Sequence, residues 1–571
     1  MKTPFKRCTL QEAEVLLNEG EVLFSDTETC GFYQKIRLLQ AYQPHLEHVL
    51  LIDWPNEYAI TAFLDKYTTA WHNSHYDITT VQQQTGTRWI PNKFEDTFLL
   101  SRLAFPDKEK FSLDETMQYV LGFDPYARQL LDKKKLQKSK WDSNFLTEDQ
   151  LLYAATDVYY MPQVWEAVKS KLEEFSYKLD MLTLKYCLDF QWNGMPTTED
   201  GLYNKHKENL QVIEEANVPV NVNSWQQVRS YLNATESDDL ALATMAMDGN
   251  DKAANVRKVR KLKKQNSFIE KFETSDNRIY GKFLPSARSG RLTSKDQNLQ
   301  QLPRALKGMF QAPPGRVLIY ADYAQLELRT ICAIVNCTVM AELFREGADL
   351  HAHTAEMVFG KNWTKADRQL SKTYNFLLLY GGGITMLLGI LMKQDILISE
   401  QQATRDRRKW RLLWKEIYGW QQEGIAKWTK GKLNYTPLGR YYKAKMMTDF
   451  LSIENQGAGA EVAKLALHYF YPRMIAYNEE HGTDFILCNF IHDSFITEGP
   501  DDPVHYKAMA KIKAEAMQEA WFEMSKLFKI TDLPMPVDVA VGTNWGDIEN
   551  DDVDNIWNYQ LEGMALCKDS K

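Results

Sequence analysis

Acidic residues at two places in the chain have the types and the spacing of metal-binding sites. The first place begins with Asp26 and Glu28, which follow the apolar segment 21–25. Alternate residues of a strand point to the same side, so both carboxylates would project from one face. A pair of this kind is more often a surface feature than a site, so the interpretation depends on further acids downstream.

Those further acids follow in a fixed order. Asp77 ends the segment 72–77 (HNSHYD), and Asp157 ends the segment 153–157 (YAATD), in which Tyr153 lies four residues earlier on the same helical face. Hard oxygen ligands suit Mg²⁺, and two such ions can activate a water and stabilise the leaving oxygen of a phosphodiester. The set resembles the proofreading 3′→5′ exonucleases with four catalytic acids, in the variant whose third motif is Tyr-xxx-Asp.

This resemblance covers about residues 20 to 175 and implies the roles of individual residues. It implies that Tyr153 orients the attacking water and that two Mg²⁺ ions are held by Asp26, Glu28, Asp77 and Asp157. All four acids are present, so the resemblance implies an active exonuclease.

The second place involves two aspartates in the C-terminal half. Asp322 follows the apolar segment 317–321, and Asp493 follows the segment 484–490. We expect the second segment to form a hairpin that brings Asp493 beside Asp322. Two carboxylates on adjacent strands are the ligand set of a two-metal site.

A stripe of side chains at four-residue intervals lies between these two aspartates. A four-residue step on a helix advances the face by about 40°, so the residues form one slanting row along which a nucleotide could lie. Cations would hold the triphosphate and rings would flank the base and sugar. Alone, such a stripe is ordinary helical amphipathicity, and its position between the two aspartates decides the interpretation. The row comprises Arg368, Lys372, Phe376 and Tyr380.

These motifs together resemble the family A DNA polymerases, the group of bacterial DNA polymerase I and related phage replicases. The resemblance rests on the segments 289–304 (SGRLTSKDQNLQQLPR), 317–329 (VLIYADYAQLELR), 349–351 (DLH) and 491–494 (IHDS), with the stripe between them. It implies that Asp322 and Asp493 hold two Mg²⁺ ions, with Mn²⁺ as an alternative. One ion would lower the pKa of the primer 3′-OH and both would neutralise charge on the transferred phosphate.

The same resemblance assigns the remaining contacts. Lys372 would donate a proton to pyrophosphate, and Glu327 would exclude a ribose 2′-OH. The dNTP contacts would come from Arg368, Lys372, Phe376, Tyr380, Glu327, Gln325 and His351. The DNA contacts would come from Arg291, Gln456 and His492.

One position departs from the family pattern. Ser494 stands where the last motif usually carries Glu, so the auxiliary carboxylate is missing. Glu498 is no obvious replacement, because the family has an acid there as well. The missing acid therefore bears on metal affinity and metal preference.

The elements that must position these residues fall into three regions. Segments 21–25 and 48–53 are typical of strands and 149–175 of a helix, which predicts an α/β domain ending near residue 175. Residues 176–280 are helical and polar. Within them, 252–264 predicts a basic amphipathic helix, which fits either a solvated face or a grip on phosphates. The basic residues proposed for DNA contact there are Lys258, Arg260, Lys261, Lys263 and Lys264.

The resemblance turns these regions into a multidomain α/β and α+β architecture. It implies a ribonuclease H-like exonuclease domain (1–175), a helical thumb (176–280), and a right-hand palm with fingers (281–571, fingers about 340–440). The acidic end is predicted to be a solvated tail, 547–571.

Composition limits the class of protein further. The 571 residues carry a net charge of −8, and seven scattered cysteines lack a CxxC pair, which argues against a zinc site or a disulfide framework. Phosphate contacts are local, so the net charge does not exclude a nucleic-acid partner. No apolar run has the roughly 20 residues of a membrane span. We expect a monomer in the cytoplasm of a bacterium or of a phage-infected host.

We therefore predict template-directed DNA synthesis from dNTPs on a primer-template, with proofreading. The chain starts almost directly with the exonuclease, which favours a replicase of the phage type, with helicase, primase or single-strand binding protein as partners. Three alternatives are a single-subunit RNA polymerase, a repair or bypass polymerase, and a 3′→5′ exonuclease whose C-terminal half only binds nucleic acid. Glu327 and the proofreading motifs oppose the first, and Ser494 is the feature that encourages the last.

Overall fold

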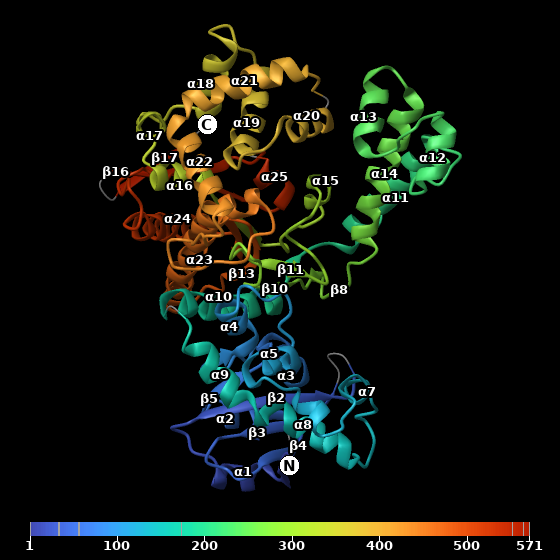
Figure 1. Ribbon diagram of the computed structural model, residues 1–571, viewed down its shortest axis with the longest axis vertical. Coiled ribbons are helices and arrows are strands. Elements are labelled where there is room, and N and C mark those ends of the chain that lie inside the picture. The colour runs from blue at the N-terminus through green and yellow to red at the C-terminus, as the bar shows by residue number, and fades with distance from the viewer. Residues whose placement is uncertain are drawn as a thin grey trace. The chain divides into compact units, whose positions relative to one another are not determined.

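The computed structural model divides the chain into two compact units (Figure 1). The first contains residues 1–192 with two short later segments, 284–288 and 438–443, and the second contains 193–283, 289–437 and 444–571. The residues that the structure describes are 2–31, 35–54, 57–172, 174–394, 396–550, 552–562 and 565–569.

A six-stranded mixed sheet forms the centre of the first unit, in the order β1-β4-β3-β2-β5-β6. On β4, Val49 and Leu51 pack into one core, whereas Leu50 and Ile52 pack into the other. Both faces of the sheet are therefore covered, which explains why this strand is a continuous apolar run. The strands are β1 Phe5–Cys8, β2 Val22–Thr29, β3 Ile36–Tyr42, β4 Val49–Asp53, β5 Thr68–Trp71 and β6 Lys93–Asp96.

Helices cover this sheet, and α8 packs against its strands β4, β2 and β3. The expected helix over 149–175 is wrong as one element: α8 ends at Tyr159 and α9 begins at Met161, with Pro162 in its first turn. Proline is tolerated there because the first N–H groups have no intrahelical acceptor. The helices are α1 Leu10–Leu16, α2 Glu57–Leu64, α3 Ser74–Thr85, α4 Thr97–Ala104, α5 Leu113–Leu121, α6 Pro125–Arg128, α7 Lys133–Gln137, α8 Glu148–Tyr159, α9 Met161–Lys169 and α10 Glu174–Asn193.

A second six-stranded sheet, antiparallel throughout, lies in the second unit in the order β13-β14-β12-β15-β16-β17. In the β13–β14 hairpin Ile491 pairs with Ser494, so His492 and Asp493 form a two-residue turn. His492 has a φ of 58°. The strands are β12 Arg316–Tyr323, β13 Ile486–Ile491, β14 Ser494–Pro500, β15 Val537–Gly542, β16 Asn555–Glu562 and β17 Ala565–Asp569.

The rest of the second unit is mainly helical, with α23 and α24 packed along each other and α24 against the sheet. Its helices are α11 Glu199–Glu215, α12 Trp225–Leu232, α13 Asp239–Met247, α14 Asp251–Ile269, α15 Arg304–Lys307, α16 Leu326–Val335, α17 Thr338–Arg345, α18 Leu350–Phe359, α19 Lys365–Leu379, α20 Ile384–Lys393, α21 Glu400–Leu413, α22 Lys415–Thr429, α23 Met447–His481, α24 Pro503–Ser525 and α25 Trp545–Glu549. Short strands are β7 Met195–Pro196, β8 Thr274–Ser275, β9 Arg278–Ile279, β10 Lys282–Leu284 and β11 Thr293–Lys295. No helix in the described part of the chain is long and apolar enough to cross a membrane.

The prediction of a solvated tail from residue 547 is wrong for the part that the structure describes. Residues 555–559 pair with β15, and the rings of Trp557 and Tyr559 are largely buried. The apolar residues between the acids supply the sheet contacts, and Lys307 pairs with Glu549 of α25. Asp551 lies outside the described residues.

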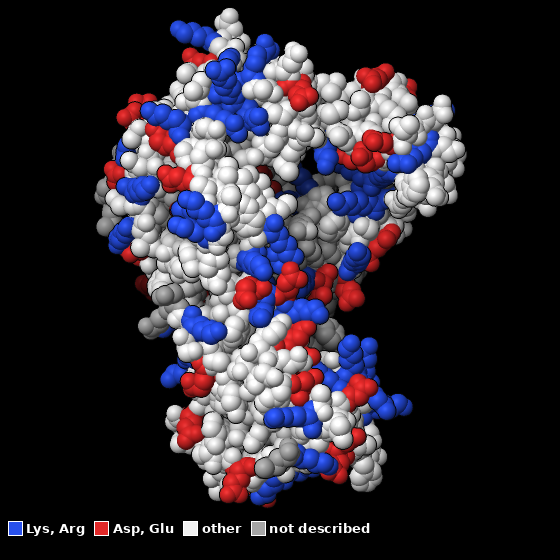
Figure 2. Space-filling model, viewed as in Figure 1, with Lys and Arg blue, Asp and Glu red and all other residues white. Residues whose placement is uncertain are grey.

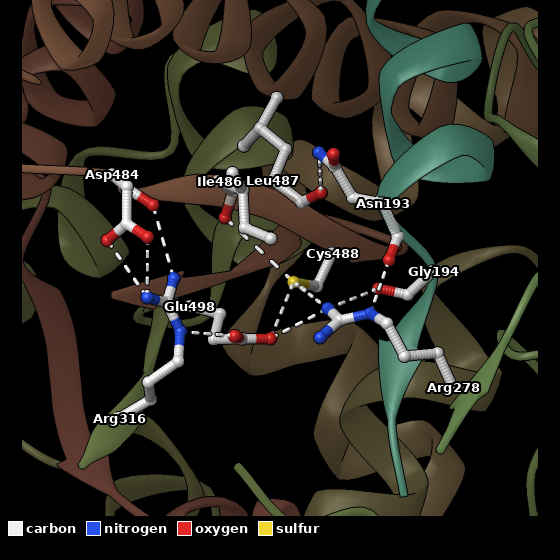
Figure 3. A network of polar contacts seen from close by, with 9 residues as sticks. All are labelled: Asn193, Gly194, Arg278, Arg316, Asp484, Ile486, Leu487, Cys488 and Glu498. Carbon is white, nitrogen blue, oxygen red and sulfur yellow. Dashed lines mark hydrogen bonds and ion pairs between the residues drawn. The ribbon is translucent and has the colours of Figure 1, made fainter. Parts of the chain in front are cut away.

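An ion network around the buried Glu498 fixes the β12–β14 part of this sheet (Figure 3). Glu498 of β14 is 2% exposed and accepts from Arg278 Nη2 (2.7 Å) and Arg316 Nε (2.5 Å). Arg316 also binds both carboxylate oxygens of Asp484, and Arg278 donates to the carbonyl of Gly194 (3.1 Å). Removing one partner from such a network leaves a buried charge uncompensated.

Candidate functional sites

Three carboxylates meet where α8 packs against β2, an interior strand of the first sheet. Asp26 and Glu28 come from β2 and Asp157 from α8, and oxygen atoms of all three lie within 4.8 Å of one another. Burial raises the pKa of Asp26 and Glu28 well above the ordinary values, and the neighbouring acids raise them further. Asp26 and Glu28 thus point to the same side of β2, as the sequence predicted, and they meet Asp157 of α8 there.

The fourth predicted acid, Asp77 of α3, lies against the same strand. Its Oδ1 accepts from Thr27 N (3.1 Å) and Thr27 Oγ1 (2.6 Å). Burial raises the pKa of Asp77 to about 7 despite these hydrogen bonds. It also contributes to the raised pKa of Asp26, so all four acids form one electrostatic group.

Two tyrosines hold Asp157. Tyr126 of α6 donates its hydroxyl to Asp157 Oδ1, and Tyr153 also hydrogen-bonds this carboxylate, with the two rings 5.8 Å apart. Burial raises the pKa of Asp157 to about 6. Tyr153 was predicted from the sequence, whereas Tyr126 was not, because nothing local in Asp124-Pro125-Tyr126 indicates where that short helix packs.

The residues of this site fit divalent cations. Three buried carboxylates and the half-buried Asp26, all with raised pKa values, repel one another, and a cation would relieve that repulsion. Carboxylate oxygens are also the ligands that Mg²⁺ prefers.

In the second unit, Asp322 and Asp493 lie on neighbouring parts of the antiparallel sheet. Asp322 is the last residue but one of β12, and Asp493 lies in the turn before β14, which pairs with β12. Burial and then Asp493 raise the pKa of Asp322 well above its ordinary value. Burial raises the pKa of Asp493 to about 6. Asp322 Oδ1 is buried with no hydrogen-bond partner. Buried polar atoms normally have a partner, and a bound cation would supply one here.

Other residues predicted for nucleotide and DNA contact gather beside these aspartates. Arg291 pairs with Glu327, and Tyr380 donates its hydroxyl to Glu327 Oε2 (2.9 Å). Asn455 Nδ2 contacts Tyr380 Oη (2.8 Å) and the Glu327 carbonyl (3.1 Å). Burial raises the pKa of Asp493, and the positive charge of Arg291 offsets part of that rise, so the Arg291–Glu327 pair lies close to the turn.

The missing carboxylate at Ser494 has no substitute in Glu498. Ser494 Oγ donates to the Ile491 carbonyl (2.9 Å), so it completes the turn, and Tyr320 also bonds it. Glu498 faces its two arginines in the network of Figure 3.

An acid that the sequence did not indicate lies on the other side of Asp322. Asp538 of β15 pairs directly opposite Asp322, and directly opposite residues of antiparallel strands share a face. Asn558 of β16 donates to Asp538 Oδ1 (2.5 Å). The charge of Asp538 contributes to the raised pKa of Asp322. The sequence shows only that Asp538 is a polar residue inside the apolar strand VDVAVG. The pairing of β15 with β12 is what places it beside Asp322.

The helical stripe forms a second cluster on α18 and α19. Arg368 Nε donates to Asp349 Oδ2 (2.5 Å), and the rings of Phe376 and His351 lie 5.9 Å apart. Burial lowers the pKa of His351 to about 4, and Lys372 and Arg368 lower it further. Tyr380 follows at the C-terminal end of α19, about 18 Å along the helix axis from Arg368. The stripe therefore runs from this cluster to the Asp322 site.

Three predicted contact residues are less connected to these clusters. Gln325 has a φ of 59° at the start of α16, and its buried Oε1 has no hydrogen-bond partner. Gln456 lies on α23 beside Asn455 and is partly exposed. His492 lies in the β13–β14 turn, where partial burial of its ring and then the charge of Arg291 lower its pKa.

The basic helix lies within α14, where Val256 and Val259 are buried. Arg260 donates to the carbonyls of Val222 (2.6 Å) and Ser237, so it holds the neighbouring loops. Basic side chains gather over α14 in Figure 2. The exposed ones among the predicted contacts are Lys258, Lys261, Lys263 and Lys264.

Comparisons with known proteins identify the family of this chain. A model described as DNA polymerase family A matches residues 202–547, and one described as 3′-5′ exonuclease matches residues 6–173. The first covers more than half of the chain, so the chain belongs to the family A DNA polymerases, and it carries a 3′-5′ exonuclease domain. The prediction of the family and of the fold class is confirmed.

Individual relatives are bacterial. DNA polymerase I of Aquifex aeolicus is 26% identical over 592 residues, which cover 94% of this chain and 98% of that protein. Thermostable DNA polymerase I of Thermus filiformis is 29% identical over 293 residues, 48% of this chain and 33% of that protein. The fold matches the POL domain of Pol1 from M. smegmatis in complex with DNA primer-template and dNTP, with a TM-score of 0.74, 18% identity, and coverage of 92% of this chain and 96% of that one.

Proposed function

We propose that the protein synthesises DNA on a primer-template by two-metal nucleotidyl transfer and removes misincorporated nucleotides with its exonuclease. One observation carries the proposal: a buried, unpartnered oxygen of Asp322 lies beside Asp493, with Arg291, Glu327 and Tyr380 gathered around them. In this assignment Asp322 and Asp493 hold one pair of ions. Asp26, Glu28, Asp77 and Asp157 hold the other pair.

The ions, when bound, supply Lewis-acid activation of the attacking oxygen and neutralise charge on the phosphoryl group. The chain's own residues bind and orient the reactants. Arg368 and Lys372 hold the triphosphate, and Phe376 lies beside the base and sugar. Glu327, fixed by Arg291 and Tyr380, occupies the position from which a ribose 2′-OH would be excluded.

The larger arrangement is proposed on the same basis. The helices α11–α14 would be the thumb, with the exposed lysines of α14 along the DNA backbone. The sheet β12–β17 would be the palm, and residues of about 340–440 the fingers. A replicative role of the phage type, with a helicase, primase or single-strand binding protein as partner, is part of the proposal. The bacterial relatives make a role like that of DNA polymerase I the alternative.

A primer-extension assay tests the proposal. A 5′-labelled primer on a longer template is incubated with Mg²⁺, with and without the four dNTPs. Extension with dNTPs and 3′ shortening without them are the expected results. Shortening under both conditions, also with Mn²⁺, would contradict the polymerase assignment. It would favour the alternative hypothesis, a 3′→5′ exonuclease whose C-terminal half only binds nucleic acid, which the presence of Ser494 encourages.

Asp538 is expected to support the metal site that lacks the usual Glu. Replacing Asp538 with Asn should raise the Mg²⁺ concentration for half-maximal extension about tenfold, because outer carboxylates tune metal affinity on that scale. Extension at saturating Mg²⁺ and 3′ degradation should change little. The matched control is Asp501→Asn, at an exposed aspartate after β14. An unchanged Mg²⁺ dependence in Asp538→Asn would remove this role.

The buried acids of the exonuclease site also predict how metal and pH affect stability. Folded-state pKa values of about 7 for Asp77 and about 6 for Asp157 exceed the unfolded value near 3.9. Their protonation therefore stabilises the metal-free fold at low pH, and this contribution is lost as pH rises through about 6 to 7. Calorimetry should show a larger Mg²⁺-induced rise in Tm at pH 8 than at pH 5.5. Asp26→Ala/Glu28→Ala should reduce that difference, and an equal rise at both pH values would contradict the assignment.

A further inference from the structure

A small cavity in the first unit is lined by three stretches that are far apart in the sequence. Its walls come from residues 99–111, 285–288 and 440–442, all of which belong to this unit. Arg102 Nη2 donates to the Ser286 carbonyl (2.5 Å), and Lys443 N donates to the Pro106 carbonyl (3.2 Å). The three stretches are thus fixed to one another. None of the four carboxylates of the exonuclease site lines this cavity.

The lining carries an excess of positive charge. Its cationic residues are Arg102, Lys108, Arg288 and Arg440, against the single acid Glu109. Burial lowers the pKa of Arg102, and the charges of Arg288 and Arg440 lower it further, so the three guanidinium groups are electrostatic neighbours.

Nearby carboxylates offset this charge in part. Arg440 pairs with the buried Asp180, and Glu109 reaches Arg288 at 4.0 Å. Two carboxylates against four cations leave the site electropositive. Like charges held together in a partly buried place are costly unless an anion joins them.

The size and the walls of the cavity narrow the class of anion. Its volume of about 50 Å³ is several times the 10–15 Å³ that one water needs, which leaves room for a phosphate group but not for a base. The rings of Phe111, Tyr441 and Tyr442 also form part of the lining. Aromatic rings beside a basic groove are the usual platform for the bases of a single strand.

We propose that this cavity binds a backbone phosphate of the single DNA strand whose 3′ end is being degraded. The proposal rests on the exonuclease function proposed above. Arg102 and Arg288 contact the phosphate oxygens, and the tyrosine rings contact an adjoining base. Free phosphate or pyrophosphate shares the anionic chemistry but makes no use of the rings.

Arg288 is the residue to replace, because it is exposed and makes few internal contacts. Arg288→Gln is compared with Arg7→Gln, at an arginine of the same unit with the same 44% side-chain exposure, which pairs with Asp53. Both variants are made in the Asp26→Ala/Glu28→Ala protein. Fluorescence anisotropy with labelled (dT)16 should show binding weakened about three- to tenfold by Arg288→Gln, with a smaller salt dependence, and unchanged by Arg7→Gln.

Kinetics and a second ligand separate the possible outcomes. In the active protein, Arg288→Gln should raise KM for (dT)16 and leave kcat unchanged. If the parent degrades (dT)16 but Arg288→Gln binds it as the parent does, the phosphate site is wrong and the exonuclease stands. If the parent neither binds nor degrades (dT)16, the exonuclease proposal itself fails. In a titration with inorganic phosphate, Arg288→Gln could weaken the binding of phosphate but leave the binding of (dT)16 unchanged. In that case the cavity binds small anions, and its assignment to the single DNA strand is wrong.

Discussion

Replacing Asp322 with alanine should reduce primer extension about a thousandfold or more and leave 3′ degradation at the parent level. The side chain supplies a buried oxygen with no partner in the protein, so its loss removes a metal contact that nothing else can make. Asp493→Ala should behave alike, because the two carboxylates serve one site. The measurement is single-turnover extension of a labelled primer, with degradation of a single strand assayed in parallel.

The control for this prediction is Asp501→Ala, which removes an exposed carboxylate near the far end of β14. It should leave both activities unchanged. Loss of both activities in a folded Asp322→Ala protein would contradict the assignment of two separate sites. Retained extension would show that the ions are held elsewhere. A further check is metal binding by calorimetry, in which Asp322→Ala should lose affinity even without DNA.

Loss of Asp26 and Glu28 together should have the reverse effect. The Asp26→Ala/Glu28→Ala protein should degrade a single strand about a thousandfold more slowly, because two of the carboxylates that converge within 4.8 Å are gone. Extension should proceed at the parent rate, with more mispaired primer ends carried forward. Degradation of (dT)16 and extension from a mispaired terminus are the two measurements.

Thermal stability separates a lost site from a lost fold in this variant. Removing two mutually repelling carboxylates should raise, not lower, the Tm of the metal-free protein, because burial and the neighbouring acids raise the pKa of both groups. The matched control Glu19→Ala/Glu47→Ala removes two exposed acids of the same unit and should change neither activity nor Tm. Degradation that survives in Asp26→Ala/Glu28→Ala would refute the assignment of these acids.

Local patterns in the sequence were sufficient for part of the sites. Asp26 and Glu28 follow from strand alternation, and Tyr153 and Asp157 from the helical repeat, so short-range geometry alone brings each pair to one face. Asp322 and Asp493 required an expected hairpin, which β13 and β14 form. The family and the fold class followed from the order of the motifs.

The remaining parts depend on contacts between distant segments. The pairing of β15 with β12 brings Asp538 opposite Asp322, and the packing of α6 against α8 brings Tyr126 to Asp157. The C-terminal segment was predicted to be a solvated tail from its acidic residues alone. Its apolar residues, which pack into the sheet, were not considered. Arg260 looked like a phosphate contact, yet its donors reach loop carbonyls that no helical repeat can indicate.

Two short segments of the polymerase sequence, 284–288 and 438–443, belong to the first unit. They limit how that unit can be isolated. Leu284 packs with Leu99, Met181 and Leu184, and residues 438–443 supply Arg440 for Asp180. A fragment that stops at residue 192 would expose this apolar surface and leave a buried carboxylate without its partner. Cloning the exonuclease alone therefore requires grafting both segments onto it, and a domain exchange between related enzymes would have to move all three stretches together.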